Sequence, residues 1–333
     1  MEFIEHPRTA ALACYAPIVM KVAVVIPVFN GAKTVSRAIK SALSQGFQSE
    51  SEIIVVNDGS TDLTGEVLAR YQERRMRIIN QPNRGPAAAR NAAVASSKAE
   101  YLAFLDADDF FMPKKIQHSV AHLETNRRAV MLFHDAAVID VEGHELPGPF
   151  VTPSCAHAPS MQEMLTRWWP IVPSTAVIRR SVFDACGGFD EAFKSAAYED
   201  PYLWIRAREW GEFIYFPQRL ASYTMGAAAA RAEKYLDAQN IFLRRIEERY
   251  GRTARKLIRN TRRAYANAMA YEGLQAMSAG NHAMARRYLV RALVHQPASP
   301  KNAFRLVRSF LPARIVRSLS GRTVHDSGPR LKN

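Results

Sequence analysis

The sequence is poor in cysteine and has no long hydrophobic run, and both absences narrow the class of protein. The three cysteines, Cys14, Cys155 and Cys186, are far apart and not in metal-ligand spacing, which indicates a reducing compartment and argues against a disulfide framework. No apolar stretch reaches the roughly 18 residues that a membrane-spanning helix needs. The best candidate, 10–20, is short and contains a proline. We therefore expect a cytoplasmic protein that is neither exported nor inserted in a membrane.

Glycine-rich phosphate loops and histidine metal sites are missing too. The absence of P-loop and dinucleotide-type motifs excludes ATPases and nicotinamide-dependent enzymes. The nine histidines show no metal-ligand spacing.

Acidic residues are scarce in the last third of the chain. Residues 226–333 hold 22 Lys and Arg against 6 Asp and Glu, a net charge of +16, so with a total of +14 residues 1–225 carry −2. Such a basic block is typical of proteins that meet an anionic membrane surface, a nucleic acid or a charged lipid-linked substrate. Solvated helix faces are the simpler explanation. We expect no nucleic-acid partner.

The 333 residues, 48% of them hydrophobic, suffice for one large α/β domain and a smaller partner. Apolar runs alternate with helix-period segments, which predicts a doubly wound sheet with ligand-binding loops at the carboxyl ends of its strands. We expect strands at 22–28, 52–56, 77–79 and 101–105, and helices at 33–44, 62–73, 86–96 and 113–123, the last with Pro113 in its first turn.

The rhythm changes after residue 128 and predicts a mixed sheet. A long strand at 129–140 and a turn at Glu142-Gly143 into a returning strand are expected, followed by strands at 174–179 and 213–216 and helices at 161–168 and 201–210. Proline and serine at 147–160 predict a mobile loop over the active face. The predicted organisation is a disordered extension (1–19), a catalytic domain (20–225) and a helical basic region (226–333).

Clustered carboxylates follow the apolar run Tyr101–Leu105. Burying Asp106, Asp108 and Asp109 without a cation would cost several kcal/mol each, so we expect them at an open edge with a divalent ion and a diphosphate ligand. Strand alternation would point Asp106 and Asp108 the same way, towards one Mg²⁺ or Mn²⁺. A lone Asp-x-Asp is common in loops, so the context carries this prediction.

Asp58 lies between a buried strand and a glycine-bearing turn, where its carboxylate can accept hydrogen bonds from a nucleobase. A helix-capping role is the alternative, and we assign it to Asp62 instead. Pro27 and Phe29 would give backbone and ring contacts to the base.

Four segments of the sequence together resemble the inverting family 2 glycosyltransferases of the non-processive bacterial type. They are Pro27–Asn30, Asn57–Asp62, Asn83–Asn91 and Asp106–Asp109. The resemblance covers residues 21–225 and implies a GT-A fold, a mixed α/β sheet flanked by helices, here followed by an all-α region. It also implies transfer of a sugar from a nucleotide-diphosphate donor.

The resemblance implies roles for individual residues. Asp58 would bind the nucleobase, Asp108 would be a direct metal ligand, and Asp106 would be shared between ribose and metal, with Asp109 in support. The remaining nucleotide-pocket residues would be Pro27, Phe29, Asn30, Arg84, Gly85 and Arg90. Either arginine could face the base or the phosphates, or simply be solvated near the start of a helix.

Tyr198–Arg206 resembles the Glu-Asp signature of the same family and supplies the predicted catalytic base. Pro201 would force Asp200 out of helical geometry and make it the N-cap, with its carboxylate at the helix mouth. Capping alone is the alternative role. Glu199 would raise the pKa of Asp200 through like-charge repulsion.

The chain lacks the Gln-x-x-Arg-Trp motif of processive members after this segment, so we expect addition of a single sugar. The acceptor would be a hydroxyl of a glycan or lipid-linked molecule in cell-surface polysaccharide synthesis. Gly187–Glu191 would shape the acceptor side, and Trp168 and Trp169 could stack on sugars, although core packing explains at least one of them. Rival functions are a sugar-phosphate nucleotidyltransferase, whose glycine-rich loop is missing, and a nucleic-acid-binding protein.

In the basic region, 271–293 resembles one tetratricopeptide-type helix pair around Gly280-Asn281, which should pack on helices near 229–270. Apolar and basic residues alternate over 305–317, interrupted at Pro312. We expect an amphipathic basic helix that attaches the protein to the inner face of the membrane, near a lipid-linked acceptor.

Overall fold

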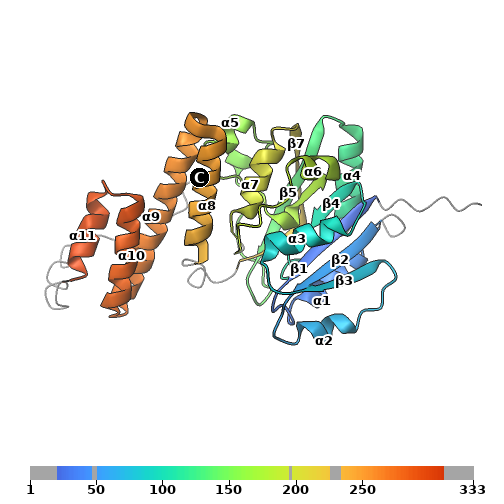
Figure 1. Ribbon diagram of the computed structural model, residues 1–333, viewed down its shortest axis with the longest axis horizontal. Coiled ribbons are helices and arrows are strands. Elements are labelled where there is room, and N and C mark those ends of the chain that lie inside the picture. Colours follow the sequence, from blue (N-terminus) through green and yellow to red (C-terminus); the bar gives the residue numbers. More distant parts are fainter. Residues whose placement is uncertain (1–20, 47–50, 195–196, 226–233, 311–333) are drawn as a thin grey trace, which may run out of the picture.

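The computed structural model describes residues 21–46, 51–194, 197–225 and 234–310. A seven-stranded sheet lies in the right half of Figure 1, and the last helices of the chain extend to its left. In sheet order the strands are β3 (Met76–Gln81), β2 (Ser51–Asp58), β1 (Val22–Val28), β4 (Tyr101–Phe104), β6 (Ala176–Arg179), β5 (Ala129–Ile139) and β7 (Glu212–Thr224). β6 runs antiparallel to both neighbours and the other pairs are parallel, so the predicted mixed sheet is confirmed.

Helices cover the sheet and continue beyond it. They are α1 (Val35–Leu43), α2 (Thr64–Ala69), α3 (Pro86–Ala95), α4 (Lys115–Thr125), α5 (Met161–Met164), α6 (Arg180–Ala185), α7 (Glu199–Ala207), α8 (Lys234–Tyr250), α9 (Arg255–Ser278), α10 (His282–His295) and α11 (Pro300–Arg308), with 3₁₀ turns η1 (Pro153–Cys155), η2 (Pro173–Thr175) and η4 (Gly251–Ala254).

The central strands β1 and β4 carry no charged residue, as expected for strands buried on both faces of the sheet. Every residue of β1 is buried, and its side chains alternate between two clusters. Val22 and Val24 belong to the cluster that includes α1 and α4, whereas Ala23 and Val25 belong to the one that includes α3 and α7. An unbroken hydrophobic run followed by a helix therefore identified these strands correctly.

Several predicted elements differ from the structure. β7 is much longer than the predicted 213–216, because register shifts against β5 accommodate Pro217 inside an edge strand. Helix α4 begins at Lys115, after Lys114 in the left-handed region at φ 64°, so Pro113 lies outside it. The turn at 142–143 forms, but the returning chain makes one isolated bridge, between Ile139 and Glu145, instead of a strand.

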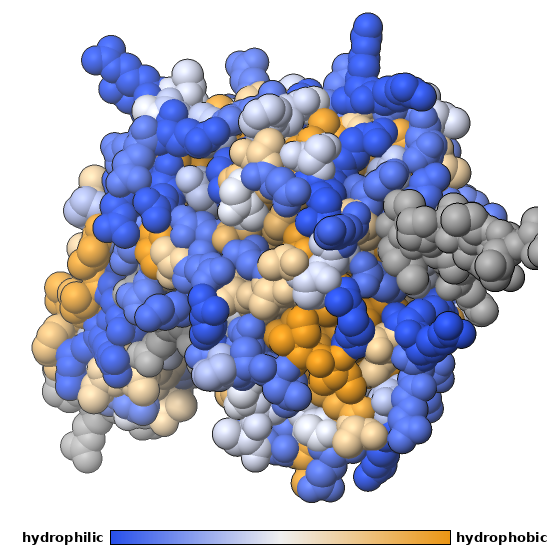
Figure 2. Space-filling view, turned by 45° about the vertical axis from the view of Figure 1, so that its right-hand side comes forward, coloured by the Kyte–Doolittle hydropathy of each residue, from blue (hydrophilic) through white to orange (hydrophobic). Residues whose placement is uncertain are grey.

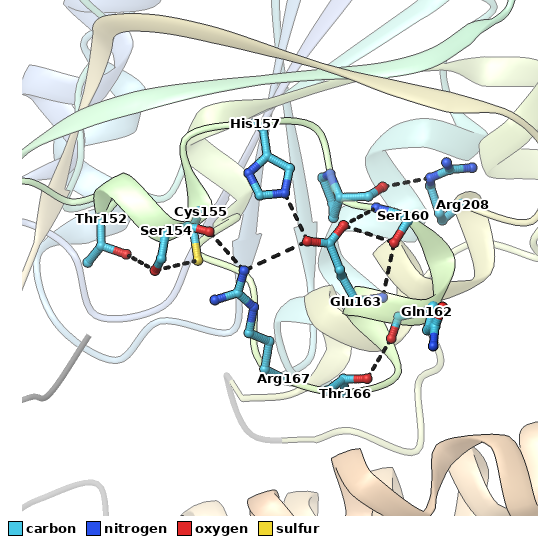
Figure 3. Close-up of polar contacts among 11 residues, drawn as sticks. Thr152, Ser154, Cys155, His157, Ser160, Gln162, Glu163, Thr166, Arg167 and Arg208 are labelled. Atoms are coloured by element: carbon cyan, nitrogen blue, oxygen red, sulfur yellow. Dashed lines mark hydrogen bonds and ion pairs between the residues drawn. The ribbon is translucent and has the colours of Figure 1, made fainter.

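The segment predicted as a mobile loop at 147–160 is fastened in place by Glu163 (Figure 3). The Glu163 carboxylate accepts hydrogen bonds from the Ser160 backbone and hydroxyl, both 2.9 Å, and pairs with His157 at 2.9 Å. Arg167 donates to the Ser154 carbonyl at 2.8 Å. Proline and serine here form a 3₁₀ turn and a capping box, while mobility of the segment stays a prediction. The following helix is also shorter than the predicted 161–168.

The helical region begins as part of the sheet domain. Figure 1 shows α8 beside that domain and α11 farthest from it. Phe242 on α8 and Leu257 on α9 belong to the same hydrophobic cluster as α3 and α7. The core therefore crosses the boundary predicted at residue 225, while the division into two domains stays a prediction.

The predicted helix pair is present as α9 and α10. The two helices are joined by a turn at Gly280 and pack against each other. Gly273 lets them approach closely, since a Cβ there would lie 2.8 Å from Leu289 Cγ. A small cluster of Tyr265, Met269 and Leu289 forms their shared core.

No helix within the described ranges is long and apolar enough to cross a membrane. The predicted extension at 1–19 and the part of the amphipathic segment from residue 311 onwards, with Pro312, lie outside the described residues.

Candidate active site

Three predicted segments meet at one edge of the sheet because β1, β2 and β4 are parallel neighbours. Pro27–Asn30, Asn57–Asp62 and Asp106–Asp109 lie at or just past the carboxyl ends of these strands. Asn83–Asn91 joins them through contacts with Asp58. The topology therefore gathers polar side chains where ligands bind in open α/β sheets.

Asp58 is buried and fixes the loop before α3. Its Oδ1 accepts from Gln81 Nε2 at 2.7 Å and from the Arg84 N–H at 2.9 Å, and its Oδ2 accepts from the Gly85 N–H at 2.8 Å. Gly85 has φ 89°, and a Cβ there would lie 2.5 Å from the Lys194 carbonyl oxygen, so only glycine fits. A carboxylate has about four acceptor positions. A nucleobase contact by Asp58 stays a prediction that would use the remaining one.

Asn30 ties the end of β1 to the loop after β2. The backbone of Asn30 lies in the left-handed region, at φ 52°. Its side-chain Oδ1 accepts a hydrogen bond from the Thr61 N–H at 2.8 Å, and its own N–H donates to Ser60 Oγ at 3.0 Å. Phe29 beside it is 51% exposed, whereas Pro27 is buried. Only Phe29 of that pair presents its ring to solvent at this edge.

Asp62 was predicted to be a helix cap, but it lies one residue before the N-cap of α2. The N-cap of α2 is Leu63, and Asp62 accepts instead from the Thr64 N–H at 3.0 Å and from the Ala32 N–H at 3.2 Å. Its carboxylate therefore fastens the start of α2 to the loop after β1, and it is not the helix cap.

The acidic motif forms a turn and not a continuation of β4. The strand ends at Phe104, and the Asp109 N–H donates to the Asp106 carbonyl at 3.0 Å. Strand alternation therefore does not set the directions of Asp106 and Asp108, and that argument was wrong. The Asp108 carbonyl accepts from Arg37 and from the Thr224 hydroxyl, both at 2.6 Å, which holds the turn in place.

Asp109 lies in the interior, contrary to the expected open edge. Its Oδ2 accepts from the Ser174 hydroxyl at 2.5 Å and its Oδ1 from the Thr224 N–H at 2.7 Å. Burial, and next the charges of Asp106 and Asp108, raises the pKa of Asp109 to about 8. Asp109 thus supports the turn from the interior, through the hydrogen bonds that it accepts from Ser174 and Thr224.

Arg90 joins the two acidic motifs. Its side chain is buried, with Nη2 2.6 Å from Asp106 Oδ1 and Nη1 2.8 Å from Glu199 Oε1. Its guanidinium also lies over the Phe189 ring. Arg90 is therefore paired with two carboxylates and is not simply solvated, while a contact with the base or the phosphates stays a prediction. Spacing alone could not show that Asp106 and Glu199, 93 positions apart, share one arginine.

Arg84 has a different environment from Arg90. Its side chain is 59% exposed and its Nη2 lies 2.7 Å from Glu191 Oε2. Glu191 belongs to the Gly187–Glu191 turn that was predicted to shape the acceptor side. Arg84 can leave this exposed pair at small cost, so contact with a donor stays a prediction.

Asp200 stands at the second residue of α7, which begins at Glu199 after Tyr198 as N-cap at φ 69°. The prediction that Asp200 is the N-cap was wrong, because Pro201 is accommodated in the first turn, where its missing N–H costs nothing. Asp200 is half-buried. Burial, and next the charge of Glu199, raises the pKa of its carboxyl well above the usual value. The direction expected from Glu199 is confirmed, although burial is the larger cause.

Glu199 is almost fully buried, and burial raises its pKa against the opposing effect of Arg90. Its second oxygen, Oε2, has no hydrogen-bond partner among the described residues. The Arg90–Glu199 pair thus places an incompletely satisfied carboxylate beside Asp200, which disfavours ionisation of the latter.

The residues at the acidic turn fit a divalent cation only in part. Within the described ranges, no group of three or more His, Cys, Asp or Glu side chains is arranged to hold a metal ion. Asp106 and Asp108 are both half-exposed, and carboxylate oxygens suit Mg²⁺ or Mn²⁺. Such a cation would need ligand or water oxygens to complete its shell, as is usual for Mg²⁺ bound with a phosphate.

Trp168 and Trp169 belong mainly to the core. The Trp168 ring lies 5.0 Å from Phe242 and 5.1 Å from Tyr198, and Trp169 is only 8% exposed, with Arg167 over its ring. Core packing therefore explains both side chains better than sugar stacking does.

A cavity of about 560 Å³ opens beside the Gly187–Glu191 turn. Its lining includes Asn91, Tyr202 and Arg206 but none of Asp58, Asp106, Asp108 or Asp200. The hollow is thus next to α7 and separate from the acidic turn, and acceptor binding there stays a prediction.

Sequence reasoning missed Arg37, Ser174 and Thr224, which hold the acidic turn. Ser174 accepts from the Asp106 N–H at 3.1 Å while donating to Asp109. These residues come from α1, η2 and the end of β7, and their only local signal is that Ser174 and Thr224 are polar residues within apolar stretches.

Comparison with known proteins identifies the family and the fold of the chain. Residues 23–187 match the family described as "Glycosyl transferase family 2". An uncharacterised glycosyltransferase of Rickettsia prowazekii (strain Madrid E) is 30% identical over 246 residues, 70% of this chain and 73% of that protein. One from Nostoc sp. (strain PCC 7120) is 40% identical over 124 residues, 36% of this chain and 38% of that protein.

A crystal structure of S. aureus TarS 1–349 has a TM-score of 0.59 with this chain at 18% identity, covering 87% of this chain and 90% of that one. Structures of the same TarS fragment in complex with UDP and with UDP-GlcNAc have TM-scores of 0.57 and 0.55. This likeness confirms the predicted fold class.

Proposed function

Because the chain belongs to glycosyltransferase family 2, we propose that it is a metal-dependent inverting enzyme that transfers one sugar to a hydroxyl acceptor. The donor would be a nucleotide-diphosphate sugar, and the acceptor a glycan or lipid-linked molecule in cell-surface polysaccharide synthesis. Family membership favours this function over the rival ones, a nucleotidyltransferase and a nucleic-acid-binding protein. The observation that carries the proposal is the Arg90 bridge between Asp106 and Glu199, which brings the acidic turn and the helix of Asp200 together.

In the proposed reaction Asp200 removes the proton from the acceptor hydroxyl as that oxygen attacks the anomeric carbon, opposite the departing diphosphate. The new bond joins the acceptor oxygen to the sugar, the bond to the diphosphate breaks, and the configuration inverts. The raised pKa of Asp200 supports this role, since a stronger base accepts the proton more readily.

Asp108 and Asp106 would hold Mg²⁺ or Mn²⁺, which when bound supplies charge stabilisation for the leaving diphosphate. Asp58, Phe29, Asn30, Arg84 and the narrow turn at Gly85 would bind the nucleotide. Arg90 and Glu199 position the acidic turn and α7, so their part in the reaction is indirect.

The proposed donor, a nucleotide-diphosphate sugar, can be narrowed by comparison with TarS, which has a similar fold. TarS has been crystallised in complex with UDP and with UDP-GlcNAc, which makes a UDP-sugar the first donor to try. Calorimetric titration of nucleotide sugars with and without Mn²⁺ tests both donor class and metal dependence.

The mechanism is tested by measuring nucleoside-diphosphate release and the anomeric configuration of the product. We expect Asp108→Ala and Asp200→Asn to reduce turnover at least a hundredfold, while donor affinity falls strongly only in Asp108→Ala. Near-normal transfer by Asp108→Ala, or a product of retained configuration, would refute the assignment.

We also propose that the C-terminal helices attach the protein to an anionic membrane surface. On α11 the apolar side chains Phe304 and Val307 are 62% and 61% exposed, and the residue after its C-cap, Phe310, is 66% exposed. Residues 282–310 contain six Lys and Arg and no Asp or Glu. Figure 2 shows apolar side chains among hydrophilic ones at its left-hand edge, on the side of these helices. Apolar and cationic side chains on one short helix are typical of interfacial binding.

Sedimentation of the full-length protein with phosphatidylglycerol vesicles tests this attachment. The triple variant F304S/V307S/F310S should lose most of its vesicle binding. Val141→Ser, at a residue 62% exposed on the sheet domain, should bind like the wild type. Equal binding by all three proteins would exclude α11 as the attachment surface.

A further inference from the structure

A second cavity, of about 430 Å³, lies among the C-terminal helices and away from the catalytic residues. The end of α8, the first half of α9 and the end of α10 enclose it. Its size is within the range of small-ligand sites.

Four arginines line this cavity from one face of α9. Arg255, Arg259, Arg262 and Arg263 follow the spacing i, i+4, i+7 and i+8, which places their side chains within one helical stripe. In the part of the chain that the structure describes, none of these four side chains forms a hydrogen bond or an ion pair. The cavity thus concentrates guanidinium groups that no side chain neutralises.

The rest of the lining does not balance this charge. Glu247 is the one acidic lining residue, so four arginines against one glutamate leave a formal charge of +3. Burial, and next the charge of Arg262, lowers the pKa of His295 at the opposite wall. Like charges at i, i+4 destabilise a helix, so the protein keeps an unfavourable arrangement that a bound anion would relieve.

We propose that this cavity is a binding site for a phosphate-bearing anion, distinct from the donor site. Guanidinium groups bind phosphate through paired hydrogen bonds, and several of them can close around one phosphate or diphosphate group. His295, as a neutral ring, and Gln296 add hydrogen-bonding groups at the α10 wall. The phosphate could come from a soluble ion or from a lipid headgroup, and the chemistry of recognition is the same for both.

Calorimetric titration of the full-length protein with inorganic pyrophosphate tests the site. EDTA is present so that metal-dependent binding in the donor site does not contribute. We expect about one site per chain, with an affinity at least tenfold weaker in R259Q/R263Q. The matched control is R70Q/R74Q, which removes two exposed arginines at the same spacing and should stay within twofold of the wild type.

Thermal melting separates a binding defect from a folding defect. Without ligand, R259Q/R263Q should melt no lower than the wild type, because substitution relieves repulsion between exposed side chains. Pyrophosphate should raise the melting temperature of the wild type and of R70Q/R74Q, and not that of R259Q/R263Q.

Vesicles of phosphatidic acid, compared with phosphatidylcholine, identify the source of the phosphate. Loss of phosphatidic acid binding in R259Q/R263Q would assign the site to a lipid headgroup, and unchanged vesicle binding with lost pyrophosphate binding would assign it to a soluble phosphate. Equal behaviour of R259Q/R263Q and the wild type towards both ligands would overturn the proposal. The catalytic assignment is independent, since none of these arginines belongs to it.

Discussion

Arg90 is the residue on which the arrangement of the site depends most. It is 3% exposed and contacts carboxylates from two distant segments, so its removal leaves Asp106 and Glu199 without their shared cation. Breaking a buried pair by removing one partner is far more costly than losing a surface pair, because a charge stays buried without compensation.

We therefore expect Arg90→Met to lower the free energy of unfolding by about 3–5 kcal/mol. Arg84→Met removes an exposed pair and should cost at most about 1 kcal/mol. Urea denaturation of both variants provides the measurement. A similar small loss for the two would show that the Arg90 contacts contribute little.

The rate of transfer should depend on pH through Asp200. A general base acts only when it is deprotonated, and the pKa of Asp200 is raised well above 3.8. The value of kcat/KM should therefore rise with pH until it passes that raised pKa, and then level off. The residual activity of Asp200→Asn should lack this ascending limb, and an unchanged limb would assign it to another group.

The raised pKa of Asp200 should also make the folded protein less stable as pH rises, whereas the rate of transfer increases. The folded protein binds the Asp200 proton more tightly than the unfolded chain, so its contribution to stability is present below pH 3.8 and is lost as pH rises through the folded pKa. Between these values the stability of the wild type should fall relative to that of Asp200→Asn, as measured by denaturation at several pH values.

At the scale of elements, sequence periodicity predicted the strands and helices well wherever burial on both faces dictated the pattern. It failed where polar contacts from elsewhere set the conformation. Composition likewise predicted a mobile loop at 147–160 but not its polar contacts, in which Glu163 anchors both Ser160 and His157.

Removal of this anchor should loosen the segment. The backbone hydrogen bond from Ser160, followed by the contact with His157, lowers the pKa of Glu163 to about 2. Its contribution to stability should therefore be present above pH 4.5 and fade as pH falls towards 2. Glu163→Ala should speed proteolysis within 147–160 at pH 7, whereas Gln162→Ala, at an exposed neighbour, should not. Equal cleavage of both would contradict the anchoring role.

At the scale of the whole molecule, α8 and the start of α9 share a core with the sheet domain. Phe242 on α8 is fully buried and lies 5.4 Å, ring to ring, from Tyr198, the N-cap of the helix that carries Asp200. Packing on α8 therefore supports the proposed catalytic helix.

Phe242→Ala should lower the free energy of unfolding by about 3–5 kcal/mol, as expected for a large core side chain. Phe304→Ala, on an exposed face of α11, should change it by no more than about 0.5 kcal/mol. Thermal denaturation followed by circular dichroism measures both. A negligible effect of Phe242→Ala would show that α8 is dispensable for the sheet domain.

The sequence by itself determined the alternation of strands and helices, the family and the position of the acidic turn, because hydrophobic periodicity and short motifs are local properties of the chain. Only the tertiary structure decided that Asp109 points into the interior, that Arg90 binds Asp106 and Glu199, and that four arginines line one cavity. Burial and charge pairing depend on side chains brought together from distant positions, and no local pattern encodes which of them meet.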